Sequence, residues 1–155
     1  MSYVYDNQNR LIQRKQPGKE WEVIVYDALD RPVLTQHALQ TSLREWVFTK
    51  YDGQGRVAYT GKYVHSSIID RNQMQSLFDS SNNTLQEYFE ERVSSGTGVQ
   101  GSYYTNDNFP NSNIEVLTIN YYDDYNFNLA GSLPPGAIIS YGKTAISNTR
   151  GLTTG

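Results

Sequence analysis

The chain has 155 residues, 13 basic and 16 acidic side chains, a net charge of −3 and no cysteine. The lack of cysteine excludes a disulfide scaffold, a cysteine metal site and thiol catalysis. The lack of a lysine- or arginine-rich run argues against nucleic acid as a partner, and no apolar stretch approaches the roughly 20 residues of a membrane-spanning helix. The 13 tyrosines and 12 glycines are typical of short strands and tight turns, and they argue against a helical bundle.

The N-terminal part of the chain is predicted to form strands joined by tight turns. Leu11–Lys15 and Trp21–Tyr26 have the pattern of strands, and Pro17-Gly18 between them is a turn signal. Arg44–Tyr51 is predicted as a further strand. Apolar side chains lie on both faces of the last two strands, so we expect both faces to be covered.

A short motif occurs three times along these strands. Each copy reads Tyr-Asp, two variable residues, then Asn, Asp or Gly, and then Arg, and an apolar strand follows. The motif tyrosines lie 21 and then 25 residues apart (5 to 26 and 26 to 51), a spacing typical of stacked supersecondary units. The motif residues are Tyr5, Asp6, Asn9 and Arg10; Tyr26, Asp27, Asp30 and Arg31; and Tyr51, Asp52, Gly55 and Arg56.

The motif has the chemistry of a hairpin turn. Aspartate favours the first position of a type I turn, where its carboxylate accepts backbone N–H bonds. The fourth position then adopts the left-handed conformation of a hairpin bulge, which Asn, Asp and Gly tolerate. We expect each tyrosine to stack beside its counterpart on the next hairpin, and each arginine to bond the aspartate or cover a ring.

The middle of the chain departs from the repeat. A helix is predicted over Asp70–Ser80, with Asp70 as its N-cap. Leu85–Val93 is ambiguous, because its Glu and Gln residues favour a helix whereas its alternation favours a strand; we favour the strand. A Gly- and Ser-rich turn or loop follows at 94–101. The apolar face of the helix comprises Met74, Leu77 and Phe78.

The C-terminal part returns to the repeat in a weaker form. Ile114–Tyr122 is predicted as a strand that runs into a degenerate fourth copy, Tyr122–Phe127. In this copy Asn126 occupies the left-handed position and Phe127 replaces the arginine. A short strand is predicted at Ala137–Tyr141, within a loop-rich end.

The predicted fold is mainly β, with consecutive antiparallel β-hairpins in a curved sheet and one short α-helix. We divide the chain into three parts. Residues 1–64 form the hairpin repeats, and residues 65–113 form a helix-plus-strand insertion with loops. Residues 114–155 form a degenerate repeat strand and the loop-rich end.

Three segments resemble the YD repeats of the RHS family: Tyr3–Leu11, Val25–Val33 and Lys50–Val57. Asn120–Tyr125 is similar, more loosely, to the large surface-associated bacterial members. The family usually has glycine before the arginine. Gly55 fits that pattern, and Asn9 and Asp30 stand in for it.

The resemblance implies a strip of β-hairpins that spirals into a hollow shell in full-length members. Some shells enclose a toxic C-terminal domain, and other members act in cell-surface contact or carbohydrate binding. The resemblance also implies a secreted or cell-surface location and no catalytic set in the repeats. We expect no cofactor. The chain enters a strand pattern at Met1 without a signal peptide. We therefore expect a piece of a longer protein whose partners are flanking repeats, or an edge-to-edge homodimer of the piece.

No catalytic or metal-binding set stands out in the sequence. His37 and His65 lack a second ligand at a metal-binding spacing, and Ser66-Ser67 beside His65 is not a nucleophile elbow. Asp123-Asp124 with Asp107 offer calcium ligands, but their spacing matches no calcium loop and turn capping already explains Asp123. Four glutamates are available for glycoside hydrolysis but are better explained by a solvated strand face: Glu87, Glu90, Glu91 and Glu115.

Aromatic side chains provide the alternative to a purely structural role. The apolar faces of sugar rings pack on aromatic rings, whereas Trp21 and Trp46 are expected to pack between hairpins. We therefore predict a non-enzymatic structural repeat segment, with carbohydrate or cell-surface binding as the alternative and hydrolysis as a third, weaker hypothesis. The possible ligand-binding aromatic residues, which flank predicted loops, are Tyr103, Tyr104 and Tyr125.

Overall fold

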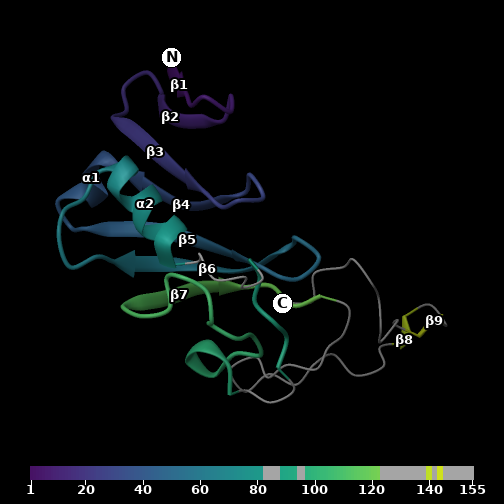
Figure 1. Ribbon diagram of the computed structural model, residues 1–155. Helices are drawn as coiled ribbons and strands as arrows, with labels where there is room; N and C mark the ends of the chain where they lie inside the picture. The colour runs from purple at the N-terminus through teal and green to yellow at the C-terminus, as the bar shows by residue number, and fades with distance from the viewer. Residues whose placement is uncertain (82–87, 94–96, 123–138, 141–142, 145–155) are drawn as a thin grey trace.

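A computed structural model shows one open antiparallel sheet that contains seven of the strands (Figure 1). The structure describes residues 1–81, 88–93, 97–122, 139–140 and 143–144. The seven strands follow one another across the sheet in chain order, and the prediction of a mainly β fold is confirmed. The strands are β1 (Ser2–Tyr5), β2 (Leu11–Lys15), β3 (Trp21–Tyr26), β4 (Pro32–His37), β5 (Glu45–Tyr51), β6 (Val57–Val64) and β7 (Ile114–Ile119).

The helices and the remaining strands are short. A four-residue helix, α1 (Ala38–Thr41), joins β4 to β5, and the predicted helix is present as α2 (Arg71–Ser81). A single 3-10 turn, η1, spans Val99–Gly101. The two-stranded pair β8 (Ile139–Ser140) and β9 (Lys143–Thr144) overlaps the strand predicted at 137–141, whose other residues lie outside the described part of the chain.

The hydrophobic core lies on one face of the sheet. Along β5, Trp46, Phe48 and Lys50 are buried while Val47 and Thr49, on the other face, are only half-buried. Register places Leu34 of β4 and Gly61 of β6 on either side of Phe48, so the buried side chains of neighbouring strands meet on the same face. The core therefore covers one face, whereas on the other face burial among the described residues of β3 is limited to Glu22 and Ile24.

Helix α2 covers this face where it crosses β3 to β5 (Figure 1). Asp70 caps the helix, because its Oδ1 accepts the Gln73 N–H at 2.8 Å and the Gln73 side chain accepts the Asp70 N–H at 2.8 Å. Met74 and Phe78 are buried in the core, and Leu77 packs against it. The helix therefore presents its predicted apolar face to the sheet.

The strand predicted over Leu85–Val93 is wrong for residues 88–93, which form two isolated bridges. The Glu90 N–H donates to the Tyr51 carbonyl at 2.8 Å, whereas the Glu91 carbonyl accepts the Thr105 N–H at 3.0 Å. The segment thus bonds β5 on one side and the loop at Thr105 on the other, and the Glu90 side chain between them points into the core. Residues 88–93 therefore do not form the predicted strand, and Glu90, which was expected on a solvated face, is buried.

One core spans the three parts into which the sequence was divided. Leu34, Met74 and Tyr121 belong to a single cluster of buried side chains, although they come from residues 1–64, 65–113 and 114–155 respectively. β7, which follows the middle part, pairs with β6 at the end of the hairpin repeats. The described residues of the middle part therefore share their packing with the sheet.

Candidate functional site

Each of the three motif copies closes a turn around its aspartate. The Asp6 Oδ1 accepts the N–H groups of Gln8 and Arg10 at 2.9 Å, and its Oδ2 accepts the Arg10 Nε at 2.8 Å. The same three bonds recur at 2.7–2.9 Å around Asp27 and Asp52. Desolvation would raise the pKa of Asp6, but the hydrogen bonds and charge of Arg10 hold that pKa below its ordinary value.

The fourth position of each turn has the left-handed conformation that the motif predicts. The φ angles are 62° at Asn9, 60° at Asp30 and 77° at Gly55. In each turn the N–H of this residue donates to the carbonyl of the aspartate at 2.9–3.1 Å. The register of each hairpin shifts at the tyrosine, which marks the bulge.

Gly55→Val is expected to lower the free energy of unfolding by about 1–2 kcal/mol more than Gly55→Asn, because a β-branched side chain resists the left-handed region. Space is not the cause, since a Cβ on residue 55 would have an Arg31 nitrogen, 3.9 Å away, as its nearest neighbour. Urea unfolding of the two variants measures the difference. Equal free energies would contradict the conformational requirement at residue 55.

The turns are joined to one another by a ladder of arginine and tyrosine side chains. The guanidinium carbons of Arg10, Arg31 and Arg56 lie 5.1, 4.4 and 4.3 Å from the ring centroids of the next tyrosines. These tyrosines donate their hydroxyls at 2.8–3.0 Å to the carbonyl of the residue after each arginine. We call this set the tyrosine–arginine ladder; its tyrosines are Tyr26, Tyr51 and Tyr122.

The ladder differs from the expected stack of tyrosine rings. An arginine of the preceding turn lies over each ladder tyrosine, so the repeating contact is between unlike side chains. Tyr122 from the degenerate fourth copy forms the last rung, whereas the rest of that copy, residues 123–127, lies outside the described residues. Tyr5, in the first copy, is 54% exposed.

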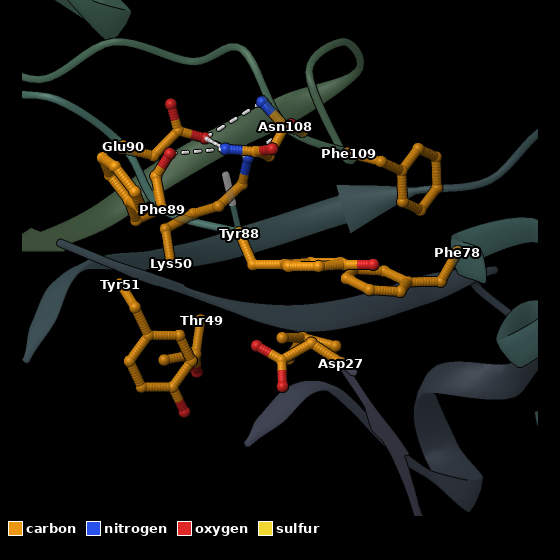
Figure 2. A pocket seen from close by; sticks show the side chains of 11 residues that line it. Asp27, Thr49, Lys50, Tyr51, Phe78, Tyr88, Phe89, Glu90, Asn108 and Phe109 are labelled. Carbon is orange, nitrogen blue, oxygen red and sulfur yellow. Dashed lines mark hydrogen bonds and ion pairs between the residues drawn. The ribbon is translucent and has the colours of Figure 1, made fainter. Parts of the chain in front are cut away.

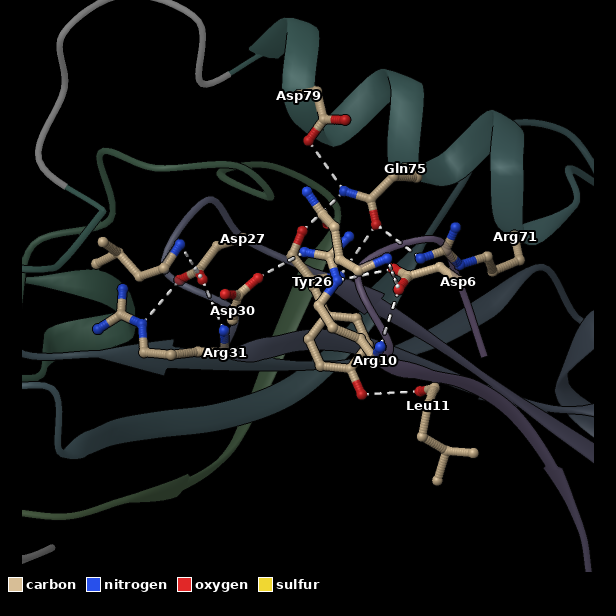
Figure 3. A network of polar contacts seen from close by, with 12 residues as sticks. Asp6, Arg10, Leu11, Tyr26, Asp27, Asp30, Arg31, Arg71, Gln75 and Asp79 are labelled. Atoms are coloured by element: carbon tan, nitrogen blue, oxygen red, sulfur yellow. Dashed lines mark hydrogen bonds and ion pairs between the residues drawn. The ribbon is translucent and has the colours of Figure 1, made fainter. Parts of the chain in front are cut away.

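Helix α2 and neighbouring turns reinforce the first rung (Figure 3). Arg10 donates to the Asp30 carboxylate of the next turn at 2.9 Å. Gln75 of α2 bonds both backbone groups of Tyr26, accepting its N–H at 3.1 Å and donating to its carbonyl at 2.7 Å. The bulge frees these groups from regular strand pairing, and the helix supplies their partners.

A buried ion pair lies beside the second rung (Figure 2). Lys50 and Glu90 are 5% and 1% exposed, and the Lys50 Nζ lies 2.7 Å from the Glu90 Oε1. The Glu90 carboxylate also accepts the Thr105 hydroxyl at 2.7 Å and the Asp107 N–H at 2.9 Å. Burial lowers the pKa of Lys50, although the charge of Glu90 opposes this shift.

Sequence patterns do not reveal this pair, because they predict Glu90 on a solvated strand face and do not mark Lys50 as a site residue. One signal was present. Lys50 follows Trp46 and Phe48 at every second position of β5, so its side chain points into the core. A lysine at such a position needs a buried partner.

The predicted ligand-binding aromatic residues do not form an exposed platform in the described part of the chain. Tyr104 is 3% exposed, and its ring stacks on Tyr121 with a centroid separation of 5.7 Å. Tyr103 is half-buried and meets the same ring edge-on, while Arg92 lies over Tyr121. Tyr125 lies outside the described residues. Tyr104 is therefore a core residue, not a surface ring.

The other candidate residues remain separate from one another. His37 is exposed, and its Nε2 lies 3.5 Å from the Glu22 Oε1. The His65 Nδ1 forms a hydrogen bond with the backbone carbonyl of Ser67. Across the described ranges, no three His, Cys, Asp or Glu side chains gather as metal ligands. Asp107 is exposed, and Asp123-Asp124 lie outside those ranges. None of the described helices is long and apolar enough to span a membrane.

No protein-family model, curated protein or solved structure matches the chain. The geometry of the turns, the ladder and the buried pair is therefore the basis for a functional proposal.

Proposed function

We propose that the chain is a non-enzymatic structural segment of a larger YD-repeat protein of the RHS type, secreted or at the cell surface. The tyrosine–arginine ladder is the observation that supports this role. The same contact joins hairpins one and two, two and three, and the third turn to the segment after β7. A contact that recurs with the repeat can be continued by further copies of the motif.

The ladder couples hairpins because each arginine acts on two of them at once. Arg31 bonds the Asp27 carboxylate within its own turn at 2.8 Å and lies over Tyr51 of the next hairpin. Its second nitrogen donates to the Tyr88 carbonyl at 2.5 Å. Loss of the planar guanidinium therefore weakens the turn, the next hairpin and the segment near residue 88 together.

The partners in this proposal are flanking hairpins of the same protein. β1 forms one edge of the sheet, and its four residues are all exposed. An exposed edge strand offers unpaired backbone groups to another strand. A second copy of this chain is the competing partner, and a concentration-dependent dimer in sedimentation would identify it.

Arg31→Lys is expected to destabilise the protein by about 1–2 kcal/mol, although the charge is kept. Lysine can neither bond the Asp27 carboxylate and the Tyr88 carbonyl through one planar group nor stack on Tyr51 as such a group. Hydrogen exchange is expected to accelerate in both the second and the third hairpins.

Arg14→Lys is the matched control. Arg14 pairs with the buried Glu22, but its own side chain is 43% exposed and lies over no tyrosine ring of the ladder. Because lysine keeps the charge of this pair, the replacement is expected to cost less than about 1 kcal/mol.

Equal effects of the two substitutions would remove the ladder as the coupling element. Faster exchange confined to residues of the second turn would have the same meaning, because it would show that the turn opens without its neighbours. Loss of protection on both sides of Arg31 supports a strip that folds as one unit.

A second candidate function is ligand binding, and one cleft favours it. The cleft has a volume of about 450 Å³ and lies between the third turn and residues 89–92. Its volume is within the range of roughly 300–1,000 Å³ that is common for small-ligand sites. Its lining combines aromatic and hydrogen-bonding side chains that suit a sugar, including Gln54, Arg56, Glu91 and Tyr122.

Titration with a panel of oligosaccharides tests this second function. Binding should shift the amide resonances of Gln54 and Glu91 and should be lost in Gln54→Ala. If no sugar shifts these resonances at millimolar concentration, the structural role alone remains.

A further inference from the structure

Three side chains with complementary chemistry meet beneath the third hairpin. The Lys50 Nζ of β5 lies 2.7 Å from the Glu90 Oε1 and 3.5 Å from the Asn106 Oδ1. Glu90 and Asn106 are 40 and 56 residues away from Lys50 in the chain, so the fold alone brings the three together. A buried amine is thus in contact with a buried carboxylate and with the carboxamide of the half-buried Asn106.

The surroundings activate the carboxamide of Asn106. The Tyr59 hydroxyl lies 3.1 Å from its Oδ1 and 2.9 Å from the Thr105 carbonyl, so its one hydrogen is shared between these two acceptors. The Asn106 Nδ2 donates to the Asn111 carbonyl at 3.0 Å. Tyr59 is fully buried, and this burial raises the pKa of its hydroxyl, which therefore stays a donor. As negative charge develops on Oδ1 during attack by a nucleophile, this oxygen becomes the stronger acceptor, and the hydroxyl hydrogen can turn to it from the Thr105 carbonyl.

The surroundings also favour Lys50 as a nucleophile. Burial disfavours its charged form, whereas Lys50 and the surrounding donors hold the pKa of Glu90 below its ordinary value against the effect of burial. The Glu90 carboxylate therefore stays charged, and its contact with Nζ at 2.7 Å places it to accept the proton that the ammonium must lose. Lys50 Nζ also donates to the Asn108 carbonyl, which fixes the direction of the amine. Contact between positioned groups replaces a bimolecular encounter with an intramolecular one, which can accelerate amide formation greatly.

We propose that Lys50 and Asn106 become joined by an amide bond between their side chains, with Glu90 as the catalytic acid and base. This inference goes beyond the structural role proposed above and does not depend on it. The bond would tie β5 to the loop that carries Asn106 and would close a large loop of the chain covalently. It would be formed by the folded protein itself, without a second enzyme.

The reaction balances without an oxidant or a cofactor. Glu90 takes a proton from the Lys50 ammonium, and the Nζ lone pair attacks the Asn106 Cγ to form the new carbon–nitrogen bond. The carbonyl electron pair moves to Oδ1, where the Tyr59 hydroxyl stabilises it. Glu90 passes its proton to Nδ2, then takes the second proton of Nζ as the Cγ–Nδ2 bond breaks. The released ammonia accepts this proton and leaves as ammonium.

The mass of the intact, folded protein tests the proposal. The chain is expected to be lighter than its sequence by one ammonia molecule, once it has been held under native conditions until its mass is constant. Digestion should then yield a branched peptide that joins the segments around Lys50 and Asn106, with no tryptic cleavage after Lys50. A folded chain that keeps its full sequence mass would overturn the proposal and leave a purely ionic contact.

Two variants distinguish this amide bond from a succinimide, which causes the same loss of mass. A succinimide formed at any asparagine also releases ammonia, but it does not require a lysine side chain. Lys50→Met and Asn106→Ala are both expected to keep the full mass, whereas a succinimide elsewhere would persist in both. Asn111→Ala is the matched control, because Asn111 contributes its backbone carbonyl, and this variant should still lose one ammonia.

Loss of ammonia without a branched peptide would also overturn the proposal. This outcome is read on the unaltered protein, so it does not depend on whether the variants fold. The digestion therefore decides between the amide bond and a succinimide even if Lys50→Met is unstable.

Discussion

Glu90→Gln is expected to lower the free energy of unfolding by about 3–5 kcal/mol, because Lys50 keeps its ammonium charge in this variant and loses the carboxylate that pairs with it or takes its proton. The substitution keeps the size of the side chain but removes the negative charge that faces Lys50. Urea unfolding followed by tryptophan fluorescence measures the loss, because Trp46 lies in the same core.

The cost is large because Glu90 is more than an ion-pair partner. Its carboxylate accepts bonds from the Thr105 hydroxyl and the Asp107 N–H as well as from Lys50. An amide can accept only through one oxygen, and its NH2 group would face other donors. The network that orders residues 105–108 therefore loses acceptors at the same time as Lys50 loses its counter-charge.

Glu91→Gln is the matched control. Glu91 is the exposed neighbour, and its replacement is expected to change stability by less than about 0.5 kcal/mol. If the two substitutions cost the same, the buried pair does not hold residues 88–93 and 105–108 on the sheet. That result would indicate that the aromatic contacts around Tyr104 hold these residues in place.

The turns could be predicted from the sequence because their information is local. Asp27 and Arg31 are four residues apart, and the whole clamp, including the left-handed residue Asp30, fits within one turn. The alternation that sets the bounds of β2 and β3 is equally local, as is the Asp70 cap of α2. Each of these features depends on side chains that are neighbours before the chain folds.

The buried pair and the ladder rungs depend on contacts between distant residues. Glu90 lies among charged and polar residues, a composition typical of a solvated surface. Its side chain is nevertheless buried, where it pairs with the buried Lys50 of β5. Tyr104 flanks a loop in the sequence, yet Tyr121 and Arg92 enclose its ring. Local patterns cannot reveal such partners, because the same residues would be exposed in a different tertiary arrangement.

Gly61 is a further residue whose importance appears only in three dimensions. It lies in the middle of β6, opposite Phe48 of β5, where the register with β7 shifts. A Cβ at this position would lie 2.1 Å from the Glu115 carbonyl oxygen and 2.6 Å from the Phe48 ring. The backbone of β7 therefore approaches β6 more closely than any other residue would permit.

Gly61→Ala is expected to destabilise the protein by about 3 kcal/mol, at the upper end of the usual cost of overpacking, because the obstacle includes backbone and not only a flexible side chain. Gly53→Ala is the control, since its Cβ would meet only the Phe89 ring at 3.4 Å, and its expected cost is below about 1 kcal/mol. Hydrogen exchange should show protection lost first in β7, the edge strand, while β2 to β5 keep theirs. If protection is instead lost equally in β2 to β7, movement of Phe48 in the core relieves the close approach at Gly61, and displacement of β7 alone does not. The pairing between β6 and β7 would then tolerate a side chain at residue 61 better than the close backbone approach implies.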